Sequence, residues 1–298
     1  MRGLINRETA GGESCSPGSG RLSPVAALVR RHDRDRFQTA LFAPPELREP
    51  LFALYAFNYE IARVRETVSQ PVLGQIRLQW WRESIAAAFD GGPVRQHIVV
   101  GALTTTIRAH GLTRAHFDRL IDAREEDLSD APATTFSALE NYAESTSARL
   151  VYLALESLGV RDPEAGKAGF HIGVAYALAG LLRAMPFHAR AGRLVIPADI
   201  AAQTGLDPAD YCVLRSTRSL RSATAEIAAA ADRHLVAARA HRRAITRRAL
   251  PALLPAIVTA RSLMRLKRVG YDPFDPALAA PDPTQSWRLA ISAFRNRY

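Results

Sequence analysis

The stretch HIGVAYALAGLLRAMPFHARAGRLVIP, at residues 171–197, is the most informative part of this sequence. Its first half is apolar at helical spacing and predicts a long, largely buried helix. Pro186 interrupts the pattern, and the helix is expected to break there because proline lacks a backbone N–H and its ring clashes with the preceding turn. A polar turn with Gly192 and Arg193 follows, and a short apolar run ends at Pro197.

A second informative stretch, LYAFNYEIARVRE at residues 54–66, belongs to a helix predicted over residues 46–69. Side chains recurring at i, i+3 and i+4 define the inward face of this helix. That face consists of Leu51, Leu54, Tyr55, Asn58, Ile61, Ala62 and Arg65. The stretch therefore indicates a core helix that carries a few polar side chains toward the interior.

The first of these stretches resembles the second aspartate-rich segment of squalene and phytoene synthases. In that family a helix carries an Arg and Asp together and a further Asp four residues on, before a Gly-Arg turn and a short run ending in Pro. Four residues match this pattern, namely Arg183, Gly192, Arg193 and Pro197. The two aspartate positions hold Ala184 and His188 instead. The degenerate second motif thus comprises Gly180, Arg183, Ala184 and His188.

Residues 54–66 resemble the first aspartate-rich motif of the same synthases. The degenerate first motif comprises Asn58, Ala62, Arg63 and Glu66. Ala62 and Arg63 fall where the family has paired aspartates, and Glu66 falls where it has a third carboxylate. Arg63 lies three residues from both Glu60 and Glu66, so an internal ion pair with one of them is expected. Direct binding of a diphosphate by its planar guanidinium is the alternative.

These substitutions bear directly on metal binding. Carboxylate-bound Mg²⁺ would offset the charge of a departing diphosphate, and Mg²⁺ requires hard oxygen ligands. Ala184 supplies no ligand, Arg63 repels the ion, and the imidazole of His188 suits Zn²⁺ or Cu²⁺ better than Mg²⁺. His188 is therefore interpreted as an ordinary, partly buried histidine, and no metal site is predicted.

Further blocks extend the resemblance from about Phe37 to Leu266. These blocks are QWWRESI (79–85), DAREEDL (122–128) and ENYAESTS (140–147). Together with LRAMPFH (182–188), they are similar to the divergent branch of the family typified by the mitochondrial complex I assembly factor. The resemblance implies an all-α isoprenoid synthase fold, a helical bundle around a deep central cavity.

Composition is that of a globular protein. Across 298 residues, 48% are apolar, which is enough for a sizeable core. The two cysteines form no disulfide framework and suit a reducing compartment. No window approaches 18 uncharged apolar residues, so a membrane-spanning helix is not expected, and the first 20 residues do not resemble a secretory signal.

The local composition of the chain predicts its domain organisation. Residues 1–23 are rich in Gly, Ser and charge and are predicted to be disordered. Residues 24–298 are predicted to form a single squalene/phytoene synthase-like domain. Within it, residues 272–283 form a Pro-rich strap and residues 284–298 a terminal helix.

The net charge of +10 is concentrated in one region. Residues 213–268 contain 13 basic residues against Glu226 and Asp232, a net charge of +11. A long helix predicted over residues 219–248 would place Arg233, Arg243 and Arg247 opposite an apolar seam. Anionic lipid and an acidic partner are candidate ligands for such a face, and a merely solvated face is the alternative. Nucleic acid is not predicted, because no recognition module accompanies the charge.

The resemblance, together with the absence of aspartates from both motifs, leads to two functional hypotheses. The first is a non-catalytic protein acting in respiratory complex I assembly with subunits or assembly factors of that complex, cytoplasmic and peripherally bound to the inner membrane. The second is a prenyl diphosphate transferase, or a protein that binds an isoprenoid lipid. Its ligand-binding candidates would be Tyr55, Arg63, Arg183, Arg190 and Arg193. A cofactor is expected only under the enzyme hypothesis, as Mg²⁺ contacting Glu66.

Overall fold

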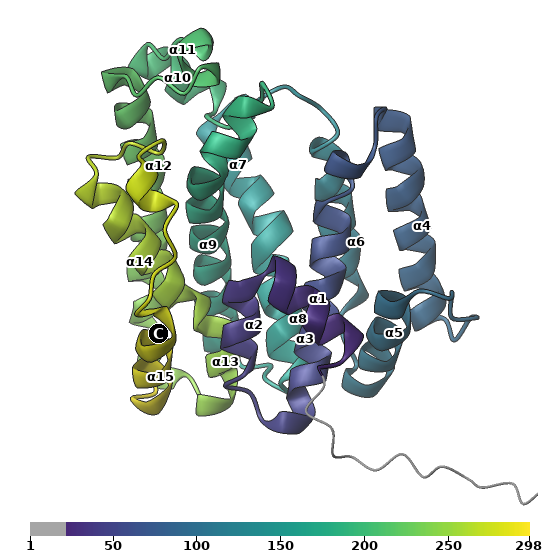
Figure 1. Cartoon of the computed structure of the whole chain (residues 1–298). Helices are drawn as coiled ribbons and strands as arrows, with labels where there is room; N and C mark the ends of the chain where they lie inside the picture. Colours follow the sequence, from purple (N-terminus) through teal and green to yellow (C-terminus); the bar gives the residue numbers. More distant parts are fainter. Residues whose placement is uncertain (1–21) are drawn as a thin grey trace, which may run out of the picture.

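The computed structural model describes residues 22–298, and most of the segment predicted to be disordered lies outside this range (Figure 1). The described residues form helices joined by turns, with no β-strand among them, which confirms the all-α prediction. Ser23 caps the first helix, because its hydroxyl accepts a hydrogen bond from the Ala26 N–H.

The first half of the bundle runs from α1 to α8. Its helices are α1 (Pro24–His32), α2 (Arg34–Ala40), α3 (Pro45–Ala62), α4 (Pro71–Phe89), α5 (Ile98–His110), α6 (Arg114–Glu126), α7 (Phe136–Ala143) and α8 (Arg149–Ser157). A π-helical turn (Glu144–Ala148) joins α7 to α8, and a 3₁₀ turn (Arg65–Thr67) follows α3.

The second half is built on one long helix. Its helices are α9 (Pro163–Arg190), α10 (Ala198–Thr204), α11 (Pro208–Cys212), α12 (Arg218–Ala240), α13 (Leu250–Leu253), α14 (Pro255–Arg268) and α15 (Gln285–Phe294). Short 3₁₀ turns lie at Arg242–Ala244, Arg247–Ala249 and Pro276–Leu278.

α9 is the central element, and it packs against α12, α14, α8 and the π-helical turn. By length and composition it could cross a membrane, as could the bent pair formed by Arg247–Leu253 and Pro255–Arg268. However, 56% of the most apolar window of α9 is buried inside the bundle. This burial is what the core helix of a globular bundle requires.

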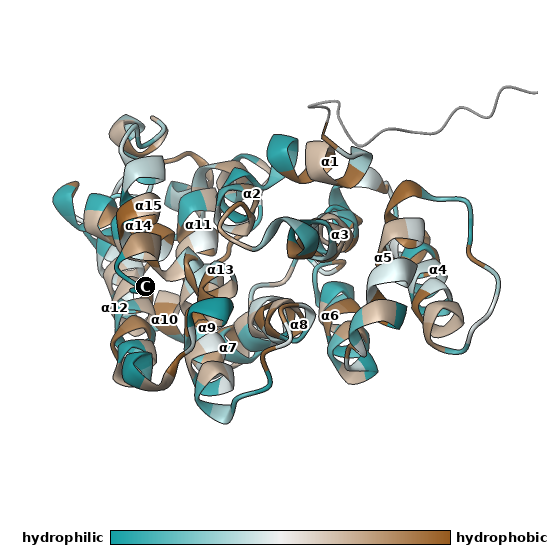
Figure 2. Cartoon of the chain, turned by 90° about the horizontal axis from the view of Figure 1, so that it is seen from below, coloured by the Kyte–Doolittle hydropathy of each residue, from teal (hydrophilic) through white to brown (hydrophobic). Residues whose placement is uncertain are grey.

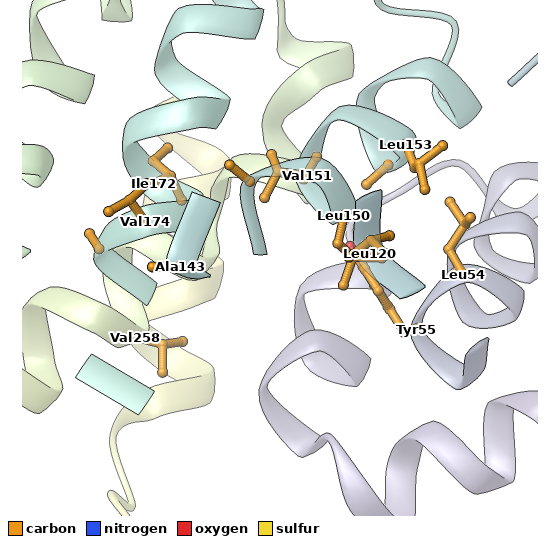
Figure 3. Close-up of a cluster of buried hydrophobic side chains, with 14 of the residues drawn as sticks. Leu54, Tyr55, Leu120, Ala143, Leu150, Val151, Leu153, Ile172, Val174 and Val258 are labelled. Carbon is orange, nitrogen blue, oxygen red and sulfur yellow. The ribbon is translucent and has the colours of Figure 1, made fainter. Parts of the chain in front are cut away.

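Gly173 allows α9 to approach the π-helical turn closely. A Cβ added at Gly173 would lie 2.4 Å from the Cα of Ala148, in the backbone of the π-helical turn. A second core contact places Leu54 and Tyr55 of α3 opposite Leu150 and Leu153 of α8 (Figure 3).

The predicted break at Pro186 is wrong, because α9 continues to Arg190. Proline removes one N–H donor and its ring crowds the preceding turn, which together cost about 3 kcal/mol. Leu182, Met185 and Ala189 are buried around it, and their packing keeps the helix intact.

Two other predicted helices end early. The helix expected over residues 46–69 ends at Ala62, and the one expected over 219–248 ends at Ala240. At the second end, His241 Nδ1 lies 2.6 Å from the Glu164 carboxylate, and the guanidinium of Arg248 donates to the carbonyl of Leu158. His241 thus holds the chain against the first turn of α9, and Arg248 holds it against the end of α8. The chain follows these contacts and does not continue as a helix.

Candidate functional site

Arg36 connects the helices that carry the two degenerate motifs. It lies on α2 with only 8% of its surface exposed. Its guanidinium is centred 4.5 Å from the Tyr176 ring of α9 and 5.8 Å from the Tyr55 ring of α3, and Nη1 lies 2.8 Å from the Asp33 carboxylate. A permanent cation therefore sits between α3 and α9.

The surroundings keep Arg36 charged. Burial disfavours the cation, but Asp33 and Tyr176 outweigh that effect and raise the pKa of the guanidinium. Burial also raises the pKa of the phenols of Tyr55 and Tyr176, so both rings are neutral and act as aromatic faces for the cation.

A second cation, the partly buried Arg124 of α6, belongs to a closed three-residue network. Its Nη1 lies 3.0 Å from the Asp127 carboxylate and 2.8 Å from the Tyr142 hydroxyl, which itself donates to Asp127 at 2.7 Å. Burial disfavours the Arg124 cation, yet Tyr142 and Asp127 raise the pKa of its guanidinium. The acidic group of this network is thus fully engaged by protein donors.

Asp130, in the loop after α6, makes a second connection between the motif segments. Its carboxylate lies 2.8 Å from Arg65, just after α3, and 3.8 Å from Arg193, just after α9. Arg193 also donates to the backbone carbonyl of Asp127 at 3.4 Å. Arg193 therefore holds the α6 loop in place.

The residues of the first motif are placed as follows. Arg63 lies 3.5 Å from Glu60 and over the Tyr59 ring, so the expected internal ion pair is confirmed. Asn58 is buried, and its Oδ1 has no hydrogen-bond partner within residues 22–298. Ala62 is half-buried, and Glu66 is exposed on the 3₁₀ turn.

The second motif lies along α9. Arg183 pairs with Asp35 of α2 at 2.8 Å, and a Cβ added at Gly180 would meet no atom within 4 Å. Ala184 is half-buried. Burial and the nearby Arg193 lower the pKa of His188 despite the presence of Asp127. His188 is therefore the partly buried, neutral histidine that was expected.

Two of the five ligand-binding candidates meet at a cavity of about 730 Å³, which we call the strap cavity. It lies between α2, α9, α14 and the strap at residues 272–283, and Arg183 and Arg190 line it. Apolar side chains such as Leu182 and Phe274 form other parts of its wall. Tyr55, Arg63 and Arg193 are not part of its lining, so the structure separates the predicted set.

The side chains at the motif positions do not fit a magnesium site. Within residues 22–298, no three His, Cys, Asp or Glu side chains are grouped so that they could hold a metal ion. Glu66 is the one carboxylate at a motif position, and Arg63 stands three residues before it. Hard oxygen donors are therefore too few for Mg²⁺ at these positions.

About half of the basic residues at residues 213–268 form contacts within the protein. Arg215, Arg221 and Arg261 form ion pairs with Asp210, Asp272 and Asp282. Arg242, Arg248 and Arg265 donate to backbone carbonyls. These six cations hold turns and the strap in place, whereas Arg233, Arg243 and Arg247, which were predicted to lie opposite the apolar seam, are exposed.

Sequence reasoning missed Arg36, Arg124 and Tyr176. Arg36 lies in the run RRHDRDRF, at residues 30–37, whose alternating charges indicate a solvated surface. The available signal was the i, i+3 spacing of Asp33 and Arg36 directly before an apolar residue. Nothing local indicates that Tyr176 would cover this guanidinium from α9.

Comparison with known proteins tests the resemblance that the motifs indicate. The model of the squalene/phytoene synthase family matches residues 29–295. The chain belongs to this family. The resemblance inferred from the motifs is thereby confirmed, while the assignment of Ala62, Arg63, Ala184 and His188 to aspartate positions of the family stays a prediction from the sequence.

Relatives within the family carry two kinds of name. A Bos taurus protein named NADH dehydrogenase (ubiquinone) complex I, assembly factor 6 is 32% identical over 299 residues, covering 99% of this chain and 90% of that protein. The Homo sapiens protein of the same name is 32% identical over 271 residues, covering 91% of this chain and 81% of that one. A presqualene diphosphate synthase from Rhodopseudomonas palustris is 26% identical over 196 residues, covering 65% and 69%.

Solved structures confirm the fold. Squalene synthase from Alicyclobacillus acidocaldarius superposes with a TM-score of 0.74 at 23% identity, covering 84% of this chain and 94% of that chain. A dehydrosqualene synthase superposes with a TM-score of 0.76 at 16% identity, covering 91% and 94%. The isoprenoid synthase fold predicted from the resemblance is therefore correct.

Proposed function

We propose that this protein is a non-catalytic member of the squalene/phytoene synthase family that acts in the assembly of respiratory complex I. We place it in the cytoplasm, peripherally bound to the inner membrane. The observation that carries the proposal is the charge at the motif positions. Neutral or cationic side chains stand at the four positions where the resemblance places aspartates, and the buried guanidinium of Arg36 and the partly buried guanidinium of Arg124 belong to the surrounding helices.

The chemistry of the family explains why this charge matters. Removing a diphosphate from an allylic carbon requires the developing negative charge to be stabilised. The arginines near the motifs are already engaged, since Arg63 pairs with Glu60, Arg183 with Asp35, and Arg193 with Asp130. Binding a diphosphate through these arginines would require the existing ion pairs to break.

The relatives support the assembly role. Proteins named as complex I assembly factor 6 align along almost the whole chain at 32–33% identity, whereas the presqualene diphosphate synthase aligns over 65% of it at 26%. A scaffold that retains the family fold while losing its acidic motifs suits binding to partner proteins better than turnover of prenyl diphosphates.

Deleting the gene in the source organism tests this function. We expect less assembled complex I on native gels and lower NADH:quinone activity, with squalene and carotenoid content unchanged. The wild-type gene should restore assembly, and so should a variant carrying Arg63→Ala, whose ion pair is only half-buried. Normal complex I in the deletion strain would refute the assembly role.

The strap cavity favours a second candidate function, the binding of an isoprenoid lipid. Its apolar wall and the arginines at its edge match a long hydrocarbon chain with an anionic head. Native mass spectrometry of the purified protein should then reveal a retained lipid that is lost in Arg183→Ala. It should persist in Arg193→Ala, because Arg193 does not line the cavity. A lipid-free wild-type protein would count against this candidate.

A further inference from the structure

Helix α15 is apolar on two opposite sides. Leu289 and Ala293 are buried, whereas Trp287, Ile291 and Phe294 are 74%, 49% and 85% exposed. At 100° per residue, the three exposed side chains fall within about 60° of one another and lie opposite the buried pair. The outer stripe of α15 therefore has no covering element within residues 22–298.

Cations flank this stripe. Arg288, Arg295 and Arg297 are exposed, and none of them forms an ion pair in the described part of the chain. Residues 283–298 contain no Asp or Glu. Arg288 and Arg295 project roughly at right angles to the apolar stripe, as the helical spacing dictates. The stripe and its flank thus combine exposed aromatic groups with uncompensated positive charge.

The end of α15 is fixed beside other exposed cations. The Tyr298 hydroxyl donates to the carbonyl of Ala238, and Arg242 donates to the carbonyl of Tyr298. Arg243 and Arg247, in the turns that follow α12, are exposed as well. α15 and α13 lie together at the lower end of the bundle in Figure 1, and α15 is at its periphery beside α14 in Figure 2.

We propose that α15 is the membrane-docking helix of this protein and that it binds the surface of an anionic lipid bilayer. Trp287, Ile291 and Phe294 would enter the boundary between headgroups and acyl chains, while Arg288 and Arg295 contact lipid phosphates. This inference rests on the membrane association proposed above and deepens it by naming the contact face.

Charge and shape favour a bilayer over a protein partner. An interfacial helix lies flat with aromatic and aliphatic side chains facing the acyl chains and cations beside them, and α15 has this pattern with Arg288 and Arg295 along one edge of its stripe. A narrow stripe on the outer side of a peripheral helix meets a flat surface without a groove. The unpaired arginines then gain lipid phosphates as counter-ions.

Vesicle co-sedimentation tests the proposal. The full chain should bind vesicles of phosphatidylcholine and cardiolipin more strongly than vesicles of phosphatidylcholine alone, and rising salt should weaken that binding. The double variant Trp287→Ser/Phe294→Ser should bind about tenfold less tightly or worse. The matched control Ile76→Ser/Ile98→Ser removes two residues that are 61% and 65% exposed on α4 and α5, and it should bind like wild type.

A second measurement reports on insertion itself. Trp287 fluorescence should be quenched by brominated acyl chains, and the quenching should disappear in Trp287→Phe. Reversing charge in Arg288→Glu/Arg295→Glu should also weaken binding about tenfold or more. Unchanged vesicle binding by the Trp287/Phe294 variant would overturn the proposal, as would unquenched Trp287. If the Trp287/Phe294 variant bound vesicles normally but failed to support complex I assembly, the exposed face of α15 would be a protein-docking surface. That result would refute lipid docking but leave the assembly role intact.

Discussion

Replacing Arg36 by methionine should destabilise the protein strongly. The substitution keeps most of the side-chain volume but removes the buried cation and leaves Asp33 without its partner at 2.8 Å. It also removes the stacking of the guanidinium on the Tyr176 ring at 4.5 Å. Because Arg36 touches α3 and α9 from α2, all three helices lose a shared contact.

The size of the effect follows from the burial of the pair. Removing one partner of a buried ion pair costs about 3–5 kcal/mol. The Asp33 side chain is 15% exposed and still accepts a hydrogen bond from the backbone N–H of residue 36, so water and backbone offset part of this cost. We therefore expect a loss near the lower limit, about 3 kcal/mol in the free energy of unfolding.

Urea denaturation followed by circular dichroism measures this loss. Arg34→Met is the matched control, because Arg34 lies on the same helix and is exposed, and it should cost less than about 0.5 kcal/mol. The Asp33→Asn variant keeps a capping side chain, and combined with Arg36→Met it should show coupling between the two sites. A cost below about 1 kcal/mol for Arg36→Met would refute the structural role assigned to this cation.

Two further predictions concern α9. Gly173→Ala should destabilise the protein by about 1–3 kcal/mol or more, because the new methyl group meets the backbone of Ala148. Gly180→Ala meets no atom and should stabilise by about 0.5–1 kcal/mol, so thermal unfolding that ranks the two variants equally contradicts the packing described here. The lowered pKa of His188 means that the unfolded chain takes up a proton at higher pH than the folded one, so stability should fall as pH drops below 6.5. His188→Asn should reduce that fall, measured as the shift in melting temperature with pH, and an unchanged shift would contradict the assignment.

The fold was predictable because its signals are local. The apolar spacing in α3 and α9 and the fixed positions of Arg183, Gly192 and Arg193 need only a continuous stretch of sequence. Helix ends were less predictable, since His241 and Arg248 hold the chain by contacts with residues about 80 and 90 positions away. Pro186 remained helical for a similar reason, because tertiary packing outweighs one lost hydrogen bond.

The loss of the acidic motifs could also be predicted from the sequence. The buried position of Arg36 and the strap cavity could not. Ala62, Arg63, Ala184 and His188 are visible in sequence. Arg36 lies in a charged run on α2 that looks solvated, and it is buried only because Tyr55 and Tyr176 cover it from two other helices. The strap cavity likewise depends on α2, α9, α14 and residues 272–283 meeting in space.

Binding of Mn²⁺, a spectroscopic substitute for Mg²⁺, tests whether the motif positions of this protein can hold a divalent ion. Free Mn²⁺ would be measured by electron paramagnetic resonance with pyrophosphate present, using an active squalene synthase as the positive control. Because the motif positions lack paired carboxylates, we predict the same free Mn²⁺ signal with and without this protein. Saturable, stoichiometric uptake of Mn²⁺ that is abolished by Glu66→Gln would contradict the account.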